Sequence, residues 1–248
     1  MANRVKGKKA NKAKGSEKHD NTELLESPDA LRETLVDKTG SFFQNKKNQN
    51  LALGLGTLVA LIIAGIFGYT YYMDSQNKAA QQEMFQAVFY FEAGDYDKAL
   101  NGDGNNYGFL EIIDEYGGSD AANLSRYYAG IAFLNKGEYN DAINQLEEFS
   151  SSDMLVQGRS YSLIGDAYME LSKFDQAASY YERAADYKPN RFFTPQYLVK
   201  AALAYEAQGN MQAAAEAYGR IVEEYPEASE YQQALKQQTR LQGLASGE

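Results

Sequence analysis

The sequence predicts an all-α protein: a single N-terminal transmembrane helix, then an α-solenoid of about four helix-pair repeats with a C-terminal capping helix. Three observations support this prediction. An uncharged apolar stretch runs from Leu51 to Met73. Four later segments share one pattern of small and aromatic residues at helical spacing. A lone amphipathic segment, residues 229–244, follows the last of them.

The apolar stretch is long enough to cross a bilayer as a helix. It spans residues 51–73, which at 1.5 Å per residue gives about 34 Å, against a hydrocarbon core of about 30 Å. A buried core helix rarely continues this far without a charge. A cleaved signal peptide has a shorter apolar region and a short leader, whereas residues 1–50 precede this one. With Tyr69, Tyr71 and Tyr72 at its end, the stretch is typical of an uncleaved membrane anchor.

The charges on the two sides of this stretch predict its orientation. Residues 1–50 contain 11 Lys or Arg, and Lys46 and Lys47 lie just before the span. Positively charged flanks stay in the cytoplasm, so residues 74–248 are expected in the periplasm and the span in a bacterial inner membrane. Residues 74–248 carry 13 basic against 27 acidic side chains, which makes nucleic-acid binding by this domain unlikely on charge grounds. The absence of cysteine excludes disulfides and thiol catalysis.

The segments that flank the span differ in character. Residues 1–26 are predicted to be a disordered basic cytoplasmic tail, which either touches anionic lipid or ribosomal RNA or is simply solvated. Residues 27–50 are predicted to form a short amphipathic cytoplasmic segment that starts at Ser27-Pro28-Asp29. Because Asp74 to Ala93 contains no Pro or Gly, the membrane helix is expected to continue into the first helix of the domain 74–248.

The repeat becomes visible when four alanines are aligned at spacings of 43, 35 and 37 residues: Ala99, Ala142, Ala177 and Ala214. Nine residues before each alanine stands an aromatic residue: Tyr90, Phe133, Tyr168 and Tyr205. Twelve residues before it stands a small residue: Ala87, Gly130, Gly165 and Ala202. A turn separates the two halves of each unit: Gly94-Asp95, Gly137-Glu138, Ser172-Lys173 and Gly209-Asn210.

This pattern resembles the tetratricopeptide (TPR) repeat, in which small residues let paired helices approach and aromatic residues fill the gaps between units. The resemblance places repeats at about residues 80–118, 123–156, 158–191 and 195–228, with a capping helix at 229–244. The third unit is the most complete, and the first carries an insertion after Leu100.

No pattern for catalysis, a cofactor or a metal is found. His19 is the single histidine and lies in the tail. The insertion Asn101–Gly108 suggests a calcium loop, but Asn106 and Ile112 stand where such a loop needs Gly and Glu, so a turn-rich loop is the better interpretation. We therefore expect a protein that is not an enzyme and has no small-molecule substrate.

The TPR resemblance also implies an inner groove lined by the first helix of each unit. The implied groove positions are Met84, Val88, Phe91, Tyr127, Ile131, Leu134, Ser162, Asp166, Met169, Val199, Leu203 and Glu206. The basic and Asn side chains with which chaperone-docking TPR domains clamp a carboxylate are missing there. The apolar half of the groove suits an apolar peptide or a partner helix, or else these side chains pack among themselves.

Small residues also recur inside the membrane span. Gly56, Ala60, Ala64 and Gly68 repeat every four residues and would form one stripe along the helix. Such a stripe lets two membrane helices approach closely, so the span is expected to bind another helix as well as lipid. Chance is the alternative, because Gly and Ala are common in membrane helices.

Basic tail, single span and acidic TPR domain together resemble the YfgM-like ancillary proteins of bacteria, over about residues 30–240. This resemblance implies a protein-binding scaffold beside the Sec translocon that associates with a membrane-anchored periplasmic prolyl isomerase or chaperone. Two alternatives remain: a scaffold subunit of another envelope machine for secretion or outer-membrane assembly, and a membrane regulator that acts through its cytoplasmic tail.

The predicted orientation can be tested with protease added to spheroplasts. The domain 74–248 should be digested while the N-terminal tail is spared, because Lys46 and Lys47 hold the N-terminus in the cytoplasm. Immunoblots against tags at the two ends measure this. Cleavage of the domain only after lysis would contradict the orientation.

Overall fold

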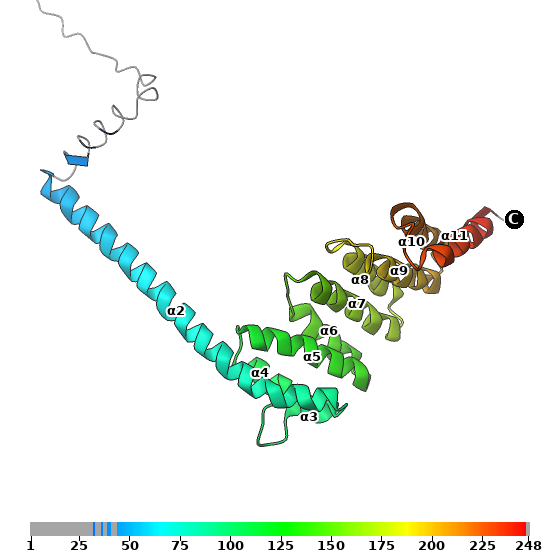
Figure 1. Cartoon of the computed structure of the whole chain (residues 1–248), viewed down its shortest axis with the longest axis horizontal. Coiled ribbons are helices and arrows are strands. Elements are labelled where there is room, and N and C mark those ends of the chain that lie inside the picture. Colours follow the sequence, from blue (N-terminus) through cyan, green and yellow to red (C-terminus); the bar gives the residue numbers. More distant parts are fainter. Residues whose placement is uncertain (1–31, 33–35, 37–38, 41–43, 247–248) are drawn as a thin grey trace, which may run out of the picture. The chain divides into compact units, whose positions relative to one another are not determined.

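The computed structural model describes residues 32, 36, 39, 40 and 44–246. Within them the chain forms ten α-helices and no β-strand, so the predicted all-α class is confirmed. The helices, shown in Figure 1, are α2 (Lys46–Glu92), α3 (Tyr96–Asn101), α4 (Phe109–Glu115), α5 (Asp120–Lys136), α6 (Tyr139–Glu148), α7 (Met154–Glu170), α8 (Phe174–Asp186), α9 (Thr194–Gln208), α10 (Met211–Glu224) and α11 (Tyr231–Ser246). The predicted tail 1–26 and the predicted helix start at Ser27 lie outside the described residues.

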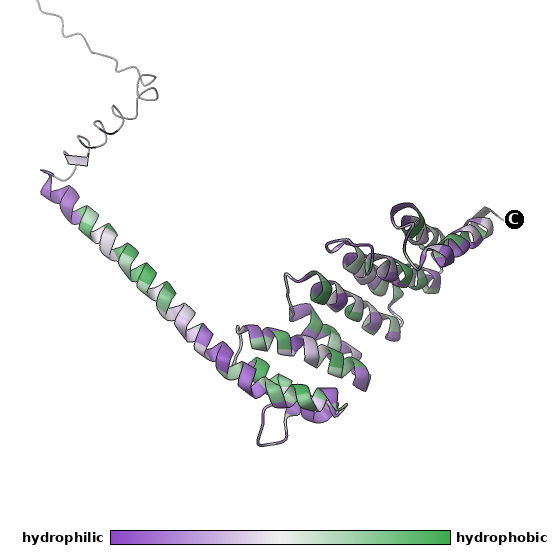
Figure 2. Cartoon of the chain, in the orientation of Figure 1, coloured by the Kyte–Doolittle hydropathy of each residue, from purple (hydrophilic) through white to green (hydrophobic). Residues whose placement is uncertain are grey.

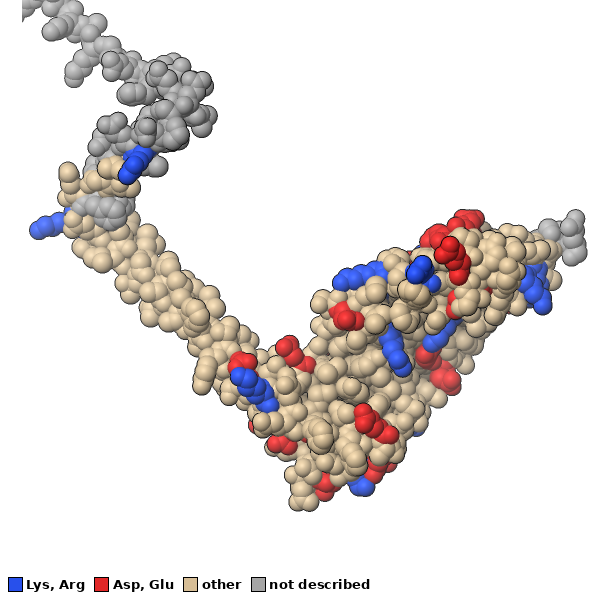
Figure 3. Space-filling model, in the orientation of Figure 1, with Lys and Arg blue, Asp and Glu red and all other residues tan. Residues whose placement is uncertain are grey.

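Helix α2 contains the apolar stretch. The chain divides into two compact units, residues 1–67 and 68–248, and the boundary falls within this helix. In the first unit, the large apolar side chains of α2 from Leu51 to Phe67 are exposed. The stretch has a mean hydropathy of 2.4 over its most apolar window, so α2 is long and apolar enough to span a membrane. Figure 2 shows this run of hydrophobic residues, and Figure 3 shows that it is free of charge.

The predicted continuation of this helix is confirmed, because α2 ends only at Glu92. Its second part is attached to the solenoid by a side-chain cap. The Asn77 Oδ1 accepts the backbone N–H of Ala121 at 3.0 Å, in the first turn of α5. Since that N–H has no partner within its own helix, the bond satisfies a group that would otherwise be orphaned.

The second unit is a stack of helix pairs. The pairs α5–α6, α7–α8 and α9–α10 follow one another in chain order, and α11 packs against α10 (Figure 1). These three pairs overlap the predicted repeats 123–156, 158–191 and 195–228. The first repeat differs, because its second helix is interrupted after Asn101 and resumes at Phe109 as α4. Phe109 and Ile112 of α4 are buried in the same apolar cluster as Ala87 of α2.

The two helices of each pair are joined by the same turn. Gly94, Gly137, Ser172 and Gly209 all adopt left-handed backbone angles, with φ between 55° and 85°. The next residue donates its N–H to a carbonyl five residues earlier: Asp95 to Tyr90, Glu138 to Phe133, Lys173 to Tyr168 and Asn210 to Tyr205, at 2.8–2.9 Å. This is the Schellman arrangement that ends helices, and glycine favours it because a left-handed φ costs glycine little.

Within each pair the helices cross where the sequence has a small residue. Gly130, Gly165 and Ala202 are buried, and each is followed 16 residues later by a large side chain from the second helix: Leu146, Tyr181 and Tyr218. A Cβ atom on Gly165 would lie 2.6 Å from Cε1 of Tyr181, and one on Gly130 would lie 2.5 Å from Cγ of Leu146. The crossings at Gly130 and Gly165 therefore leave no room for a side chain on the first helix.

The crossing at Gly165 predicts the effect of one added methyl group. Gly165→Ala should reduce the free energy of unfolding by about 1–3 kcal/mol, because the Tyr181 ring must move. The matched control is Gly243→Ala in α11, where a Cβ would meet nothing within 4 Å. The control should be neutral or gain up to about 1 kcal/mol from reduced chain entropy. Chemical denaturation of the detergent-solubilised chain measures both, and equal stability of the two variants would contradict the packing.

Candidate protein-binding surface

In the first repeat of the solenoid, the predicted groove side chains are mostly part of the core. Met84 is buried, and Val88 and Phe91 pack against the same apolar cluster. The Phe91 ring makes edge contacts with Tyr128, at 5.2 Å between centroids, and with Phe109. In this part of the inner face, the side chains pack among themselves, which was the alternative interpretation of the sequence.

The predicted groove residues of the second repeat, Tyr127, Ile131 and Leu134, are half-buried. The Tyr127 ring packs against Phe149 with the ring centroids 5.1 Å apart, and burial raises the pKa of its hydroxyl. Leu134 touches two apolar clusters, and Ile131 is partly exposed. This group therefore combines a packing role with some accessible apolar surface.

Two of the predicted groove positions farther along the chain, Asp166 and Glu206, carry charge. Asp166 accepts hydrogen bonds from the Tyr181 hydroxyl at 2.6 Å and from the Lys200 ammonium at 2.8 Å. Lys200 also donates to Ser162, at 3.1 Å. Met169 packs against the apolar cluster between α8 and α9. The Asp166 carboxylate is therefore already paired within the chain.

The same arrangement recurs one repeat later. Glu206 of α9 accepts from the Tyr218 hydroxyl at 3.3 Å and is bound by the Arg240 guanidinium of α11. In both places the carboxylate lies on the first helix of a pair, the tyrosine on the second helix, and the cation 34 residues beyond the carboxylate. These paired charges join successive first helices. Sequence reasoning missed Lys200 and Arg240, although their offset of 34 residues, close to the repeat spacings of 35 and 37, was the signal that could have found them.

Burial changes the acid–base behaviour of these tyrosines. Burial and the Glu206 carboxylate together raise the pKa of Tyr218 to about 12. Burial and the hydrogen bond to Glu182 raise the pKa of Tyr205 to about 12. Burial and Asp166 also raise the pKa of Tyr181. The folded chain thus holds these hydroxyls protonated and donating.

Some large apolar side chains remain exposed on the second unit. Phe85 and Phe89 of α2 are 76% and 57% exposed, one helical turn apart, and were not singled out from the sequence. Leu203, a predicted groove position on α9, is 49% exposed, while Val199 beside it is half-buried. Accessible apolar surface therefore exists on the first helices of two repeats.

The small residues of the span lie on an exposed part of α2. Gly56, Ala60, Ala64 and Gly68 are all exposed, and a Cβ on either glycine would meet nothing within 4 Å. Their role in binding another helix stays a prediction.

The insertion that resembled a calcium loop is held by its own side chains. The Asp103 carboxylate accepts from the Tyr90 hydroxyl at 2.7 Å and from the backbone N–H groups of Asn105 and Asn106. These bonds, with that from Tyr90 the strongest, lower the pKa of Asp103. Among the residues that the structure describes, no cluster of acidic, His or Cys side chains could hold a metal ion.

Comparisons with known proteins agree with this fold. The family model described as "T7SS, ESX-1 secretion system protein EccA1, N-terminal domain" matches residues 27–243. A crystal structure of nearly identical TPR-like repeats from a Podosopora anserina putative kinesin light chain is similar, with a TM-score of 0.50 and 15% identity. It covers 69% of this chain and 88% of its own. A second structure of these repeats has a TM-score of 0.46 and 14% identity over 68% of this chain and 97% of that one. Comparison with curated proteins finds no match.

The tyrosine–carboxylate pairs predict loss of stability at alkaline pH. An unfolded Tyr218 loses its proton near its ordinary pKa of 10.0, whereas the folded one keeps it to about 12. Between these values the unfolded state binds fewer protons, so the free energy of unfolding falls as pH rises. Tyr218→Phe should make this decline shallower.

Urea midpoints of the detergent-solubilised chain at about pH 9 and about pH 11.5 measure the effect. The control is Tyr107→Phe, which removes a hydroxyl from an exposed side chain. An equal alkaline decline in wild type and Tyr218→Phe would show that this pair does not contribute.

Proposed function

The chain belongs to the family of the EccA1 N-terminal domain, and from this premise we propose that it is a non-enzymatic, membrane-anchored scaffold that binds protein partners. One observation supports this most directly. Helix α2 runs without a break from a stretch that is long and apolar enough to span a membrane into the first of the stacked TPR-like helix pairs. Stacked repeats present extended surfaces that suit proteins better than small molecules.

The continuity of α2 bears on how the repeats are connected to the apolar stretch. Nineteen residues of this helix, from Asp74 to Glu92, follow the apolar stretch, and they extend about 28 Å. The bond from Ala121 to Asn77 fixes α5 on the same helix. The residues that join the apolar stretch to the first repeat are therefore helical rather than an irregular linker.

The partner that we propose is a protein-export complex of the bacterial inner membrane. The family is described by an ESX-1 secretion system protein, which favours a subunit of a secretion machine. The YfgM-like resemblance of the sequence favours the Sec translocon, with a membrane-anchored prolyl isomerase or chaperone as a second partner. We place the N-terminus in the cytoplasm and residues 74–248 in the periplasm, because basic residues gather before the span. A regulator that acts through the basic tail is the remaining alternative.

Co-purification in mild detergent tests the proposal. The tagged full-length chain should recover subunits of an export complex, and their identity separates the Sec translocon from another secretion machine. Recovery of a cytoplasmic signalling protein instead would favour the regulator, and recovery of no stoichiometric partner would contradict a scaffold.

Charges introduced on the inner face should weaken this recovery. Ile131→Glu with Leu203→Glu adds two charges to accessible apolar positions, and partner yield should fall about tenfold or more because those charges would be buried on binding. The matched control, Asn144→Glu with Gln176→Glu, adds the same charge at exposed positions of α6 and α8. Equal recovery from both variants would show that partners bind elsewhere.

A further inference from the structure

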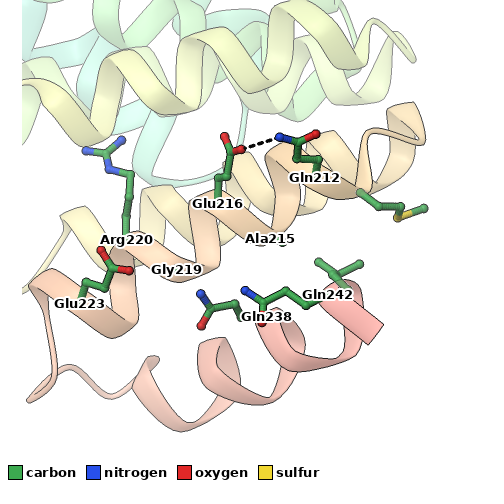
Figure 4. Close-up of a pocket in the computed structure, with 10 residues that line it drawn as sticks. Gln212, Ala215, Glu216, Gly219, Arg220, Glu223, Gln238 and Gln242 are labelled. Atoms are coloured by element: carbon green, nitrogen blue, oxygen red, sulfur yellow. Dashed lines mark hydrogen bonds between the residues drawn. The ribbon is translucent and has the colours of Figure 1, made fainter. Parts of the chain in front are cut away.

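A groove lies between the last helix of the fourth pair, α10, and the capping helix α11. It has a volume of about 460 Å³. Its floor is apolar and built from Met211, Ala215 and Gly219 of α10 and Leu241 of α11. Figure 4 shows Gln238 and Gln242 of α11 reaching toward α10, and Glu223 near the end of α10. Charged and amide side chains thus surround a small apolar floor.

The repeat itself shows what occupies such a position. Helix α10 corresponds to α8 with an offset of 37 residues, so Met211, Ala215 and Glu223 correspond to Phe174, Ala178 and Asp186. In α8 this face packs mainly against α9, the first helix of the next pair, and also reaches α10. Ala178 is only 1% exposed, and Asp186 forms an ion pair at 2.8 Å with Arg220 of α10, the next second helix in the stack. The equivalent face of α8 is therefore covered in part by another α-helix.

The structure describes no helix after α11 that could lie beside α10 as α10 lies beside α8. The corresponding face of α10 is therefore only partly covered. Helix α11 takes the place of a first helix, and its Ala234 and Leu241 are buried in the cluster that contains Tyr218 and Ile221. Met211 remains 37% exposed. Glu223, the counterpart of Asp186, is exposed and has no ion pair or hydrogen bond among the described residues. One repeat earlier, the carboxylate at the equivalent position, that of Asp186, binds the guanidinium group of Arg220 on α10.

We propose that the groove between α10 and α11 binds an amphipathic α-helix of a partner protein, which takes the place of the next helix of the solenoid. The inference deepens the proposed scaffold function and rests on it. The partner helix would run parallel to α10, as α10 runs parallel to α8. It would turn small and apolar residues toward Met211, the exposed part of the groove floor, and place a Lys or Arg in its C-terminal half opposite Glu223. Helix α10 is an example of such a helix, because it carries the buried Ala217 and Ile221 close to Arg220, which binds Asp186.

The probe for this site is a synthetic peptide with the sequence of α10, Met211–Glu224, held helical by a covalent staple on its solvent-facing side. It should bind the full-length chain in detergent micelles. Glu223→Arg should weaken binding about five- to tenfold, because an attraction to the peptide's arginine becomes a repulsion. A peptide in which that arginine is changed to Glu should bind Glu223→Arg better than wild type, which a purely structural role of Glu223 would not produce.

Two controls keep the test specific. Glu227→Arg makes the same charge change at an exposed position outside the groove, and peptide binding should stay at the wild-type level. The melting temperatures of both variants should equal that of wild type, because neither side chain is buried.

Several results would overturn the inference. The first is peptide binding that is unchanged in Glu223→Arg, and the second is failure of the peptide to bind a folded wild-type chain. The third is a homodimer in sedimentation that Glu223→Arg dissociates, which would make a second copy the occupant. If Glu223→Arg recovers export-complex subunits as well as wild type does, this groove is not the partner site although the scaffold function stands. Absence of partners from wild type itself would contradict the function instead.

Discussion

The close crossing of the two helices within each pair is the contact on which the rest of the solenoid depends. Gly130 meets Leu146, and Gly165 meets Tyr181, at distances that leave no space for a Cβ atom. Both pairs are 16 residues apart, as are Ala202 and Tyr218. A fixed separation in sequence, bridged by a Schellman turn of fixed geometry, sets the angle and depth of each crossing. Ser172 accepts a left-handed φ of 55° at the turn, so the constraint holds even where glycine is absent.

Because the crossings fix one repeat upon the next, polar pairs between repeats recur with the repeat length. Asp166 with Lys200, Glu206 with Arg240, and Asp186 with Arg220 are each separated by 34 residues. Partly exposed ion pairs contribute little to stability individually. The pairs of Asp166 and Glu206 occupy the inner face, since these carboxylates of α7 and α9 already have partners within the chain. The apolar part of that face, near Ile131, remains partly exposed.

The sequence was sufficient for the features that depend on local patterns. Small residues at Gly130 and Gly165, and glycine at three of the four turns, predicted the helix pairs because close helix crossings require small residues and left-handed turns favour glycine. Absence of Pro and Gly after Asp74 predicted that α2 would continue. The first repeat was harder. The position 16 residues after Ala87 is Asp103, which lies in a loop, and Phe109 of α4 reaches the core instead.

The candidate surfaces were less predictable, because side-chain burial is decided by several helices at once. The pattern identified Phe91 as a groove position, but its ring packs between residues of three other helices. Conversely, Phe85 and Phe89 share a helix with the buried Met84 and Ala87, and only the arrangement of neighbouring helices shows that they remain exposed. Lys200 could be recognised as the partner of Asp166 only once the repeats were known to stack in register.

The two ends of a solenoid differ from its interior, because each end lacks a neighbour that would bury its apolar face. At one end α11 covers Tyr218 and Ile221, yet a single helix cannot cover what a helix pair covers in the interior. At the other end Phe85 and Phe89 remain on the open side of α2. A partner helix in the proposed groove between α10 and α11 would add one more layer and leave the crossings at Gly130 and Gly165 unchanged. Substitutions at an end of the solenoid could therefore change the affinity for such a partner without a matching loss of stability in the interior repeats.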